Sequence, residues 1–310
     1  MKIAISIGDL NGIGLEIALR AHEEVKKHCH PIYCINENML AWGAALLDID
    51  VPSDFEIRDC GKVFEIEPGV CSAQAGESSY DSFITAVALA KSKEVNGIVT
   101  LPINKGAWSM AGLFYKGHTD ALSDLLGSDA IMMLGCEALF TILYTQHIPL
   151  RDVFHEIKSK KLKAFLLKVY EELRVDHIGV LGLNPHAGDN GVIGDEEEEI
   201  TKAIHKANHF LEREVFFGPL VPDTAFTPNS RKGCQHFVCM YHDQGLIPLK
   251  TLYFNESINV SLNAGIVRTS VDHGTAFDIA YKNANPSLVS YINAIKEAVK
   301  LSFGKELLTF

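Results

Sequence analysis

MKIAISIGDLNGIGLEIALRAHEEVKKHCHPIYCI, residues 1–35, reads as a strand, a turn, a helix and a second strand. Apolar and β-branched residues dominate Lys2 to Ile7, apolar residues recur at helical spacing from Ile13 to Val25, and another apolar run extends from Pro31 to Ile35. A strand followed by a helix and a further strand is the repeating unit of α/β proteins. This stretch therefore predicts an α/β fold.

The alternation of short apolar runs with helical patterns continues toward the C-terminus. Further runs typical of strands lie at residues 97–101, 130–134, 139–145, 177–183, 236–241 and 258–262. Helical spacing of apolar residues occupies Lys158 to Leu173 and Glu196 to Leu211, and a closing helix has one apolar face between Leu288 and Val299. The 310 residues exceed the roughly 250–300 at which one core stops growing, and there is no repeat or linker, so we expect two interleaved lobes.

The acidic run Glu196 to Glu199 stands at the expected start of a helix, directly after Gly194 and Asp195. Negative charge at that end of a helix complements the macrodipole. We therefore expect a solvated first turn here rather than a calcium site.

The composition excludes several classes of protein. A net charge of -11 argues against a large basic face for nucleic acid or an anionic membrane. No apolar run approaches the ~20 residues of a membrane span, and the N-terminus lacks a secretory signal, so we expect a cytoplasmic protein. The seven cysteines are scattered without a CxxC pair, which argues against a disulfide framework.

Three histidines each follow an apolar strand and stand in a polar or glycine-containing turn. They are His147 in YTQHIPLRD, His186 in GLNPHAGDNG and His242 in MYHDQG. Strand ends are where α/β folds form their sites, and neutral imidazoles suit zinc and similar divalent ions. Spacing alone leaves two readings open, a three-histidine metal site or three separate turn residues.

Two other segments contain groups that suit an anion. In YKGHTDAL, residues 115–122, backbone amides, His118 and Thr119 precede a helical pattern, although Thr119 could equally be a simple N-cap. Lys250, Asn259 and Arg268 lie in an otherwise apolar stretch and suggest a clamp for phosphate or carboxylate, with a surface role as the alternative for Lys250. The turn from Gly8 to Gly14 is not GxGxxG, so it does not predict a Rossmann nucleotide site.

Together and in this order, these segments resemble the 4-hydroxythreonine-4-phosphate dehydrogenases. The resemblance extends from the Gly8 turn to the HGTA segment and is carried by LPINKG (101–106), GHTD (117–120), GLNPHAG (182–188), PDT (222–224), YHDQG (241–245) and RTSVDHGTA (268–276). The chain departs from the family at Leu10 and Asn11, where proline and alanine are usual, and at Leu101, where glycine or alanine is common.

The resemblance implies roles for particular residues. It implies a divalent metal held by His147, His186 and His242, in a homodimer whose active sites lie at the subunit interface and share metal ligands between partners. The implied substrate contacts are His118, Thr119, Lys250, Asn259 and Arg268. For proton transfer or support of the histidines, the candidates are Lys105, Asp223 and Asp243.

HGTAFDIAYKNANP, residues 273–286, is similar to the adenosine-binding loop of the isocitrate and isopropylmalate dehydrogenases. This wider resemblance implies their two-lobed α/β/α fold with a central cleft, and a nucleotide site that needs no GxGxxG. The implied contacts to NAD or NADP are His273, Gly274, Thr275, Ala276, Asp278 and Asn285. We expect a nucleotide-binding lobe at residues 1–125 plus 250–310 and a metal-binding and dimerisation lobe at 126–249.

The activity that the resemblance implies is oxidation of 4-phosphohydroxy-L-threonine with NAD or NADP. The product would decarboxylate to 3-amino-2-oxopropyl phosphate, in the biosynthesis of pyridoxine 5′-phosphate (vitamin B6). Two alternatives stay open: a dehydrogenase of threonate or erythronate 4-phosphate, and a metal-dependent hydrolase. The sequence does not choose between the two nicotinamide cofactors or among zinc, cobalt and magnesium, although histidine ligands favour zinc or cobalt.

Overall fold

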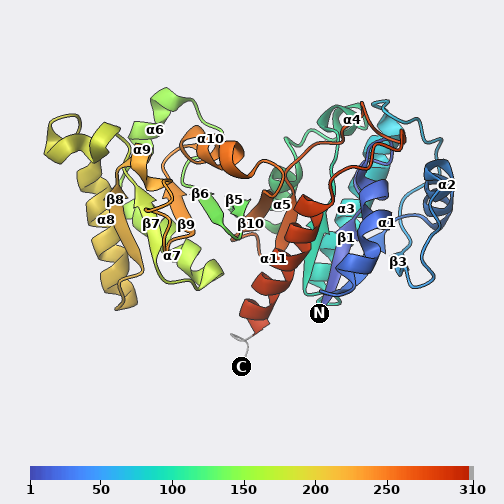
Figure 1. Cartoon of the computed structure of the whole chain (residues 1–310), viewed down its shortest axis with the longest axis horizontal. Helices are drawn as coiled ribbons and strands as arrows, with labels where there is room; N and C mark the ends of the chain where they lie inside the picture. Colours follow the sequence, from blue (N-terminus) through green and yellow to red (C-terminus); the bar gives the residue numbers. More distant parts are fainter. Residues whose placement is uncertain (307–310) are drawn as a thin grey trace. The chain divides into compact units, whose positions relative to one another are not determined.

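Figure 1 shows a computed structural model in which residues 1–306 are described. The chain divides into two compact units. The first comprises Met1–Ala130 together with the chain from Ile258 onward, and the second is Ile131–Ser257. Within residues 1–306, no helix is long and apolar enough to cross a bilayer.

The strands of the first unit are parallel apart from the last one. Their order is β3 (Ile57–Arg58), β2 (His30–Cys34), β1 (Lys2–Ser6), β4 (Gly97–Thr100), β11 (Arg268–Val271) and β10 (Ile258–Leu262). Only β10 runs antiparallel to its neighbour β11 among these pairs. The carboxyl ends of β1, β4 and β11 therefore share one edge, which is where ligand sites form in α/β sheets.

Helices cover both faces of these strands. They are α1 (Gly14–Val25), α2 (Glu37–Leu47), α3 (Ala73–Lys91), α4 (Lys105–Met110), α5 (His118–Leu126) and α11 (Val289–Glu306). On one face α3 packs against β1, β2 and β4, and Phe83 shares a core with Ala4, Ile98 and Trp108. Strand side chains alternate, so Ile3, which is also buried, points to the opposite face, where α11 packs against β11, β4 and β10.

The second unit repeats the α/β arrangement with strands of its own. Their order is β5 (Ile131–Cys136), β6 (Leu139–Leu143), β9 (His236–Cys239), β7 (Ile178–Leu181) and β8 (Phe216–Leu220). The helices are α6 (Leu150–Glu156), α7 (Ser159–Leu173), η1 (Pro185–Gly191), α8 (Glu196–Leu211), α9 (Pro222–Ala225) and α10 (His242–Tyr253). Only β5 is antiparallel, to β6, so β6, β9, β7 and β8 end at one edge of the sheet.

The α/β fold and the elements expected from apolar patterns are confirmed, with shifts of a few residues at their ends. The sequence did not predict β3, β8 or β11 as strands. In β11 the residues are Arg268, Thr269, Ser270 and Val271, and all four are buried. A search for apolar runs misses this strand, because three of its four residues are polar. They can be buried because they form hydrogen bonds with residues elsewhere in the sequence.

We expected the first helical turn at residues 196–199 to be solvated, and this prediction is wrong for one of its four acidic residues. The helix α8 does begin at Glu196, and Glu198 is exposed, but Glu197 is buried with 7% of its surface accessible. Its carboxylate accepts two backbone N–H groups and a side-chain amide. The local sequence suggested a surface position for Glu197, because it does not reveal the hydrogen-bond donors at residues 183 and 184.

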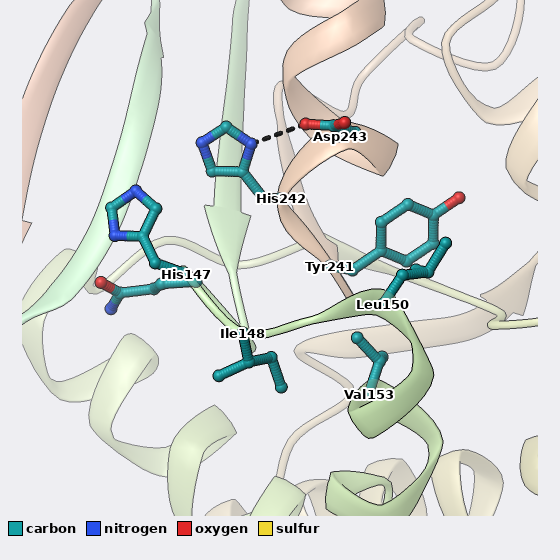
Figure 2. Close-up of a pocket in the computed structure, with 8 residues that line it drawn as sticks. His147, Ile148, Leu150, Val153, Tyr241, His242 and Asp243 are labelled. Atoms are coloured by element: carbon teal, nitrogen blue, oxygen red, sulfur yellow. Dashed lines mark hydrogen bonds and ion pairs between the residues drawn. The ribbon is translucent and has the colours of Figure 1, made fainter.

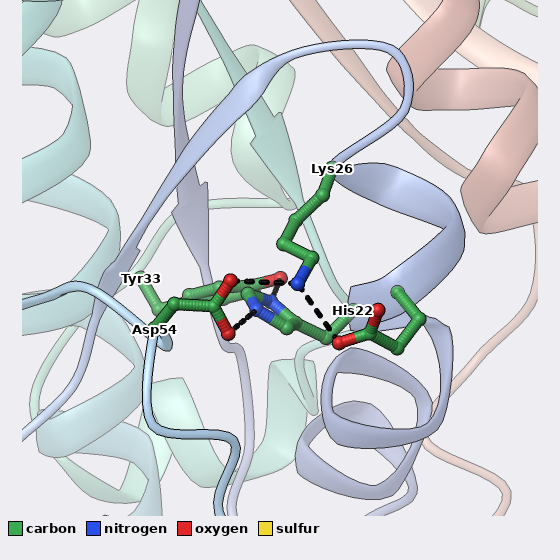
Figure 3. Close-up of polar contacts among 5 residues, drawn as sticks. His22, Lys26, Tyr33 and Asp54 are labelled. Atoms are coloured by element: carbon green, nitrogen blue, oxygen red, sulfur yellow. Dashed lines mark hydrogen bonds and ion pairs between the residues drawn. The ribbon is translucent and has the colours of Figure 1, made fainter.

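A polar network links the buried side chains of His22 in α1 and Tyr33 in β2 to Asp54 at the surface of the first unit (Figure 3). The ring of His22 is fully buried, with Nδ1 2.9 Å from the Tyr33 hydroxyl and Nε2 3.2 Å from Oδ1 of Asp54. Lys26 completes the network, since its Nζ lies 2.6 Å from Oδ2 of Asp54. We assign the network a role in stability, because none of these residues follows the carboxyl end of a strand.

Replacing His22 by phenylalanine should lower the free energy of unfolding without changing the protein's activity. The Tyr33 hydroxyl would lose its imidazole partner inside the core, which costs roughly 1–3 kcal/mol. Urea unfolding measures the loss, and Lys26→Met is the control, because solvent screens that half-exposed ion pair and leaves it a small contribution to stability. Equal losses in the two variants would contradict this assignment.

Candidate functional site

The second unit brings His147 and His242 into one pocket (Figure 2). Strands β6 and β9 pair in parallel, and their pairing continues past the strand ends, where Tyr144 N donates to Cys239 O and Thr145 N to Met240 O. The segments that follow β6 and β9 therefore place His147 and His242 side by side, with ring centroids 5.5 Å apart. The pocket is lined by residues 146–148, Leu150, Val153 and 241–243.

Asp243 orients the imidazole of His242. Its Oδ1 lies 2.7 Å from Nδ1 of His242, as the dashed line in Figure 2 marks. A carboxylate on Nδ1 leaves Nε2 available as a metal ligand and increases its basicity. The arrangement therefore suits divalent metal binding through Nε2.

His186 lies on a left-handed turn at the end of β7. In η1 the φ angles are 54° at His186, 50° at Ala187, 43° at Asp189 and 56° at Asn190, a conformation that residues other than glycine rarely adopt in succession. The imidazole is exposed and does not line the pocket of Figure 2. As predicted, His147, His186 and His242 follow the ends of β6, β7 and β9, and these three strands are neighbours in the sheet.

The three histidines do not form a closed ligand set within one chain. Over residues 1–306, the group of three potential ligand atoms lying within 4.8 Å of one another is His22, Glu23 and Asp54. Lys26 already contacts both of those carboxylates, at 2.9 Å and 2.6 Å, and so offsets part of their negative charge. Asp223, in the first turn of α9, follows β8 and so lies at the same edge of the sheet as the histidines.

Arg268 is the buried cation of the first unit. It is 3% exposed, Nη1 donates to the Ser261 hydroxyl at 3.0 Å, and Nη2 donates to the Thr100 hydroxyl at 2.8 Å. Nε has no hydrogen-bond partner among residues 1–306, and no carboxylate is among the groups that the guanidinium contacts there. Burial lowers the pKa of Arg268 to about 9, which leaves it charged at neutral pH.

Further incompletely satisfied groups belong to the same unit. His118, the first residue of α5, is 9% exposed, its Nε2 has no partner in the described part of the chain, and its ring packs against Phe83 and Trp108. Burial, together with the charge of Arg268, lowers the pKa of His118 well below its usual value, so the ring is neutral. Oδ1 of Asn259 is likewise buried without a described partner.

Thr119 is not the N-cap of α5, as one reading of the sequence expected. Gly117, with φ at +148°, occupies that position, and Asp120 instead accepts the Lys116 N–H. The Thr119 hydroxyl lies 3.5 Å from the Ser261 hydroxyl, which itself accepts from Arg268. Thr119 is therefore linked to Arg268 through Ser261.

Lys105 and Lys250 lie in different units. Lys105 begins α4, and its Cε would be 3.6 Å from a Cβ built on Gly117, so its stem lies beside the start of α5. Lys250 is in the last turn of α10 in the second unit, with its Nζ 5.5 Å from the centroid of the Phe254 ring. Lys105 thus shares the first unit with His118, Asn259 and Arg268, whereas Lys250 shares the second with the three histidines.

The loop from His273 to Asn285 follows β11 and is fastened to the first turn of the chain. Thr275 O accepts the Ile13 N–H at 3.1 Å, and Tyr281 donates to Leu10 O at 2.7 Å. A Cβ on Gly12 would approach Thr275 O to 2.8 Å, so glycine is required there. Among the residues expected to bind a cofactor, Gly274, Asp278 and Asn285 are exposed, His273 and Ala276 are half-buried, and Thr275 is buried.

Asp9 stands in that same first turn and is fully buried. Its Oδ1 accepts the Asn11 N–H at 2.9 Å, whereas Oδ2 has no partner within residues 1–306. Burial raises the pKa of Asp9 from 3.8 to about 6. The folded state therefore binds this proton more tightly than the unfolded state, so the contribution of Asp9 to stability is greatest below about pH 4 and is lost as pH rises through about 6.

Replacing Asp9 by asparagine should therefore make the protein more stable at neutral pH than the wild type. The pKa rise corresponds to as much as about 3 kcal/mol, and the asparagine side chain keeps an oxygen that can accept the Asn11 N–H. Urea unfolding of both proteins between about pH 4 and pH 8 measures the difference. A gap between the two free energies of unfolding that stays constant with pH would overturn this account.

The sequence did not single out several residues that shape these sites. Thr100 and Ser261 hold the Arg268 guanidinium, and Glu197 and Gln244 hold the segment before His186. The two partners of Arg268 lie 7 and 168 positions away along the chain. No local pattern marks such residues.

Comparison with known proteins identifies the family. The family model described as pyridoxal phosphate biosynthetic protein PdxA matches residues 27–298. A protein of Sulfurimonas denitrificans named 4-hydroxythreonine-4-phosphate dehydrogenase is 57% identical over 301 residues, covering 97% of this chain and 98% of its own.

Two solved structures are similar over nearly the whole chain. A 4-hydroxythreonine-4-phosphate dehydrogenase from Klebsiella pneumoniae is 32% identical with a TM-score of 0.83, covering 97% of this chain and 99% of that one. A terephthalate 1,2-cis-dihydrodioldehydrogenase from Burkholderia xenovorans is 26% identical with a TM-score of 0.69, covering 96% and 97%. The chain belongs to the PdxA family of pyridoxal phosphate biosynthetic proteins.

Proposed function

We propose that this protein oxidises 4-phosphohydroxy-L-threonine with a nicotinamide cofactor and a divalent metal. The product, 2-amino-3-oxo-4-phosphooxybutanoate, loses carbon dioxide to give 3-amino-2-oxopropyl phosphate for pyridoxine 5′-phosphate biosynthesis. Relatives that span nearly the whole chain carry the corresponding name. The structural observation that carries the proposal is Arg268, a buried cation without a carboxylate partner among residues 1–306.

Arg268 and its neighbours form a site that suits a phosphate. A buried charge that contacts only hydroxyls is costly unless an anion binds beside it. His118 is neutral and can donate one hydrogen bond without adding a second charge beside Arg268. Thr119 and Asn259 add polar groups in the same unit.

His147, His186 and His242 would hold the metal. The two rings that share a pocket and the Asp243 carboxylate on Nδ1 of His242 fit a divalent ion of the zinc or cobalt type. Such an ion would bind the substrate hydroxyl and lower its pKa, which favours hydride loss to nicotinamide. Asp243 holds the tautomer of His242, and Lys105 and Asp223 are the candidates for moving protons.

A second copy of the chain would complete the metal site. His186 does not join the pocket that contains His147 and His242, so the third ligand fits better from a partner. Exposed apolar side chains follow two of these histidines in the sequence, with Leu150 68% and Val192 80% accessible. A homodimer with shared active sites would cover this apolar surface.

The loop from His273 to Asn285 would bind NAD or NADP in the first unit. The loop, in which Gly274, Asp278 and Asn285 are exposed, follows the carboxyl end of β11, the edge at which α/β sheets bind nucleotides. On this view the first unit is the nucleotide-binding lobe and the second is the metal-binding and dimerisation lobe. We place the reaction in the cytoplasm, which suits seven cysteines that form no disulfide.

The test is the rise in absorbance at 340 nm when the protein, Co²⁺ or Zn²⁺, and NAD or NADP are mixed with 4-phosphohydroxy-L-threonine. A metal-dependent rise supports the proposal. The control substrates are threonate and erythronate 4-phosphate, because the dihydrodiol dehydrogenase relative suggests that this fold accepts different alcohols. A rate higher with a sugar-acid phosphate would replace the proposed substrate, and phosphate release without reduction would favour the hydrolase.

A further inference from the structure

Glu197 is a buried carboxylate of the second unit whose hydrogen bonds go to the segment before His186. Its Oε1 accepts the N–H groups of Leu183 and Asn184, both at 2.8 Å, and its Oε2 accepts Nδ2 of Asn184 at 2.9 Å. These donors belong to the segment that leads from β7 into the turn with His186. A buried carboxylate so placed can determine the path of that segment.

The same carboxylate also contacts the far side of the turn. A Cβ on Gly188, whose φ is +77°, would be 2.6 Å from Oε2 of Glu197. Within the turn, Ala187 N donates to Asn184 O, and Ile193 N donates to Gly188 O. Glu197 therefore binds Asn184 before His186 and lies close to Gly188 after it, while His186 itself is exposed.

The left-handed conformation of η1 needs such support. His186 and Ala187 adopt positive φ angles that are unfavourable for residues with a Cβ, and such strain persists only where the surroundings enforce it. Glu197 can supply such a constraint, because its carboxylate accepts three hydrogen bonds from the residues that lead into the turn. An unconstrained turn would relax toward right-handed or extended backbone and would move the His186 ring.

Gln244 links this segment to the second histidine motif. Its Nε2 donates to Gly182 O at 2.7 Å, and its Oε1 accepts the Met240 N–H at 2.7 Å. Gly182 and Met240 directly follow the neighbouring strands β7 and β9. The segment before His186 is thus held by Glu197 on one side and, through Gln244, by the strand end that precedes His242.

We infer that Glu197 is a positioning residue that sets the location of His186 for metal binding. The inference rests on the proposed function, because it requires His186 to be a ligand. Glu197 itself does not touch the metal or the substrate. It acts by enforcing the left-handed turn, so its loss should weaken metal binding more than it changes the fold.

The test is titration of the metal-free, full-length protein with Co²⁺, followed by visible absorption, for the wild type and four variants. Glu197→Gln keeps the size of the side chain but turns an NH₂ group toward the Asn184 amide, so we expect Co²⁺ affinity about 10–100-fold lower, the usual effect of disturbing a ligand's support. Glu198→Gln is the matched control, because Glu198 is in the same first turn of α8 but is exposed; this variant should bind Co²⁺ as the wild type does. His186→Ala should abolish the visible absorption that arises from tightly bound Co²⁺.

The outcomes separate the inference from the function on which it rests. A Glu197→Gln protein with native circular dichroism and wild-type Co²⁺ affinity would overturn the positioning role. If that variant does not fold, Glu197→Asp, which keeps the charge, should fold and bind Co²⁺ with intermediate affinity and a shifted spectrum; wild-type affinity there would overturn the role equally. Failure of the wild type and Glu198→Gln to bind Co²⁺ would instead refute the metal site itself, and the inference with it.

Discussion

Replacing Arg268 by methionine should lower kcat/KM for the phosphorylated substrate by about 10³-fold, roughly 4 kcal/mol of transition-state stabilisation. Arg268 is the one buried cation of the first unit's described residues whose hydrogen bonds go only to hydroxyls, so a bound phosphate would be its charge partner. Steady-state rates at 340 nm measure the loss.

The same substitution should leave stability unchanged or raise it. Methionine matches the length of the arginine stem and removes a buried, unpaired charge, and such replacements are often neutral or stabilising. Urea unfolding separates this outcome from a general structural defect. A fall in activity accompanied by a large loss of stability would mean that Arg268 is structural.

Two comparisons make the phosphate assignment specific. Arg268→Lys keeps the charge but loses the two-pronged geometry that reaches Ser261 and Thr100, so it should recover only part of the rate. The ratio of kcat/KM for phosphorylated and unphosphorylated hydroxythreonine should collapse in Arg268→Met. An unchanged ratio would show that Arg268 contacts another part of the substrate.

His186→Ala and His242→Ala should each reduce metal-dependent turnover to background. Each removes one of three proposed ligands, and the remaining imidazoles cannot close a stable site. Activity with saturating NAD or NADP and added Zn²⁺ or Co²⁺ measures the effect. His209→Ala is a control, since His209 lies in the last turn of α8 and is exposed.

A heterodimer of these two variants should regain about half of the wild-type rate. His186 does not share the pocket of His242 within a chain, so the two ligands of a site would come from different copies, and one of the two sites would then be intact. Differently tagged chains, co-expressed and purified as the mixed dimer, provide the sample. No recovery would mean that both histidines of a site come from one chain.

Much of the fold follows from local patterns in the sequence. The turn at Gly8 and the helix to Val25 arise from neighbouring residues, and the observed β1 and α1 match that reading closely. Local patterns failed where the partners are distant. The strand β11 was missed because its residues are polar, and the hydrogen bond that buries Arg268 goes to Thr100, 168 positions away. Glu197 was expected to be solvated because the donors that bind it lie 13 and 14 positions before it.

The sequence by itself determined the α/β class, the strand-end histidines and the resemblance that named the family, because motifs and apolar periods are properties of consecutive residues. Only the tertiary structure decided which groups are buried without partners among residues 1–306, such as Nε of Arg268 and Nε2 of His118. It also decided that His147 and His242 share a pocket that His186 does not line. Burial and convergence depend on strand order, and strand order is set by packing between segments that are remote in the chain.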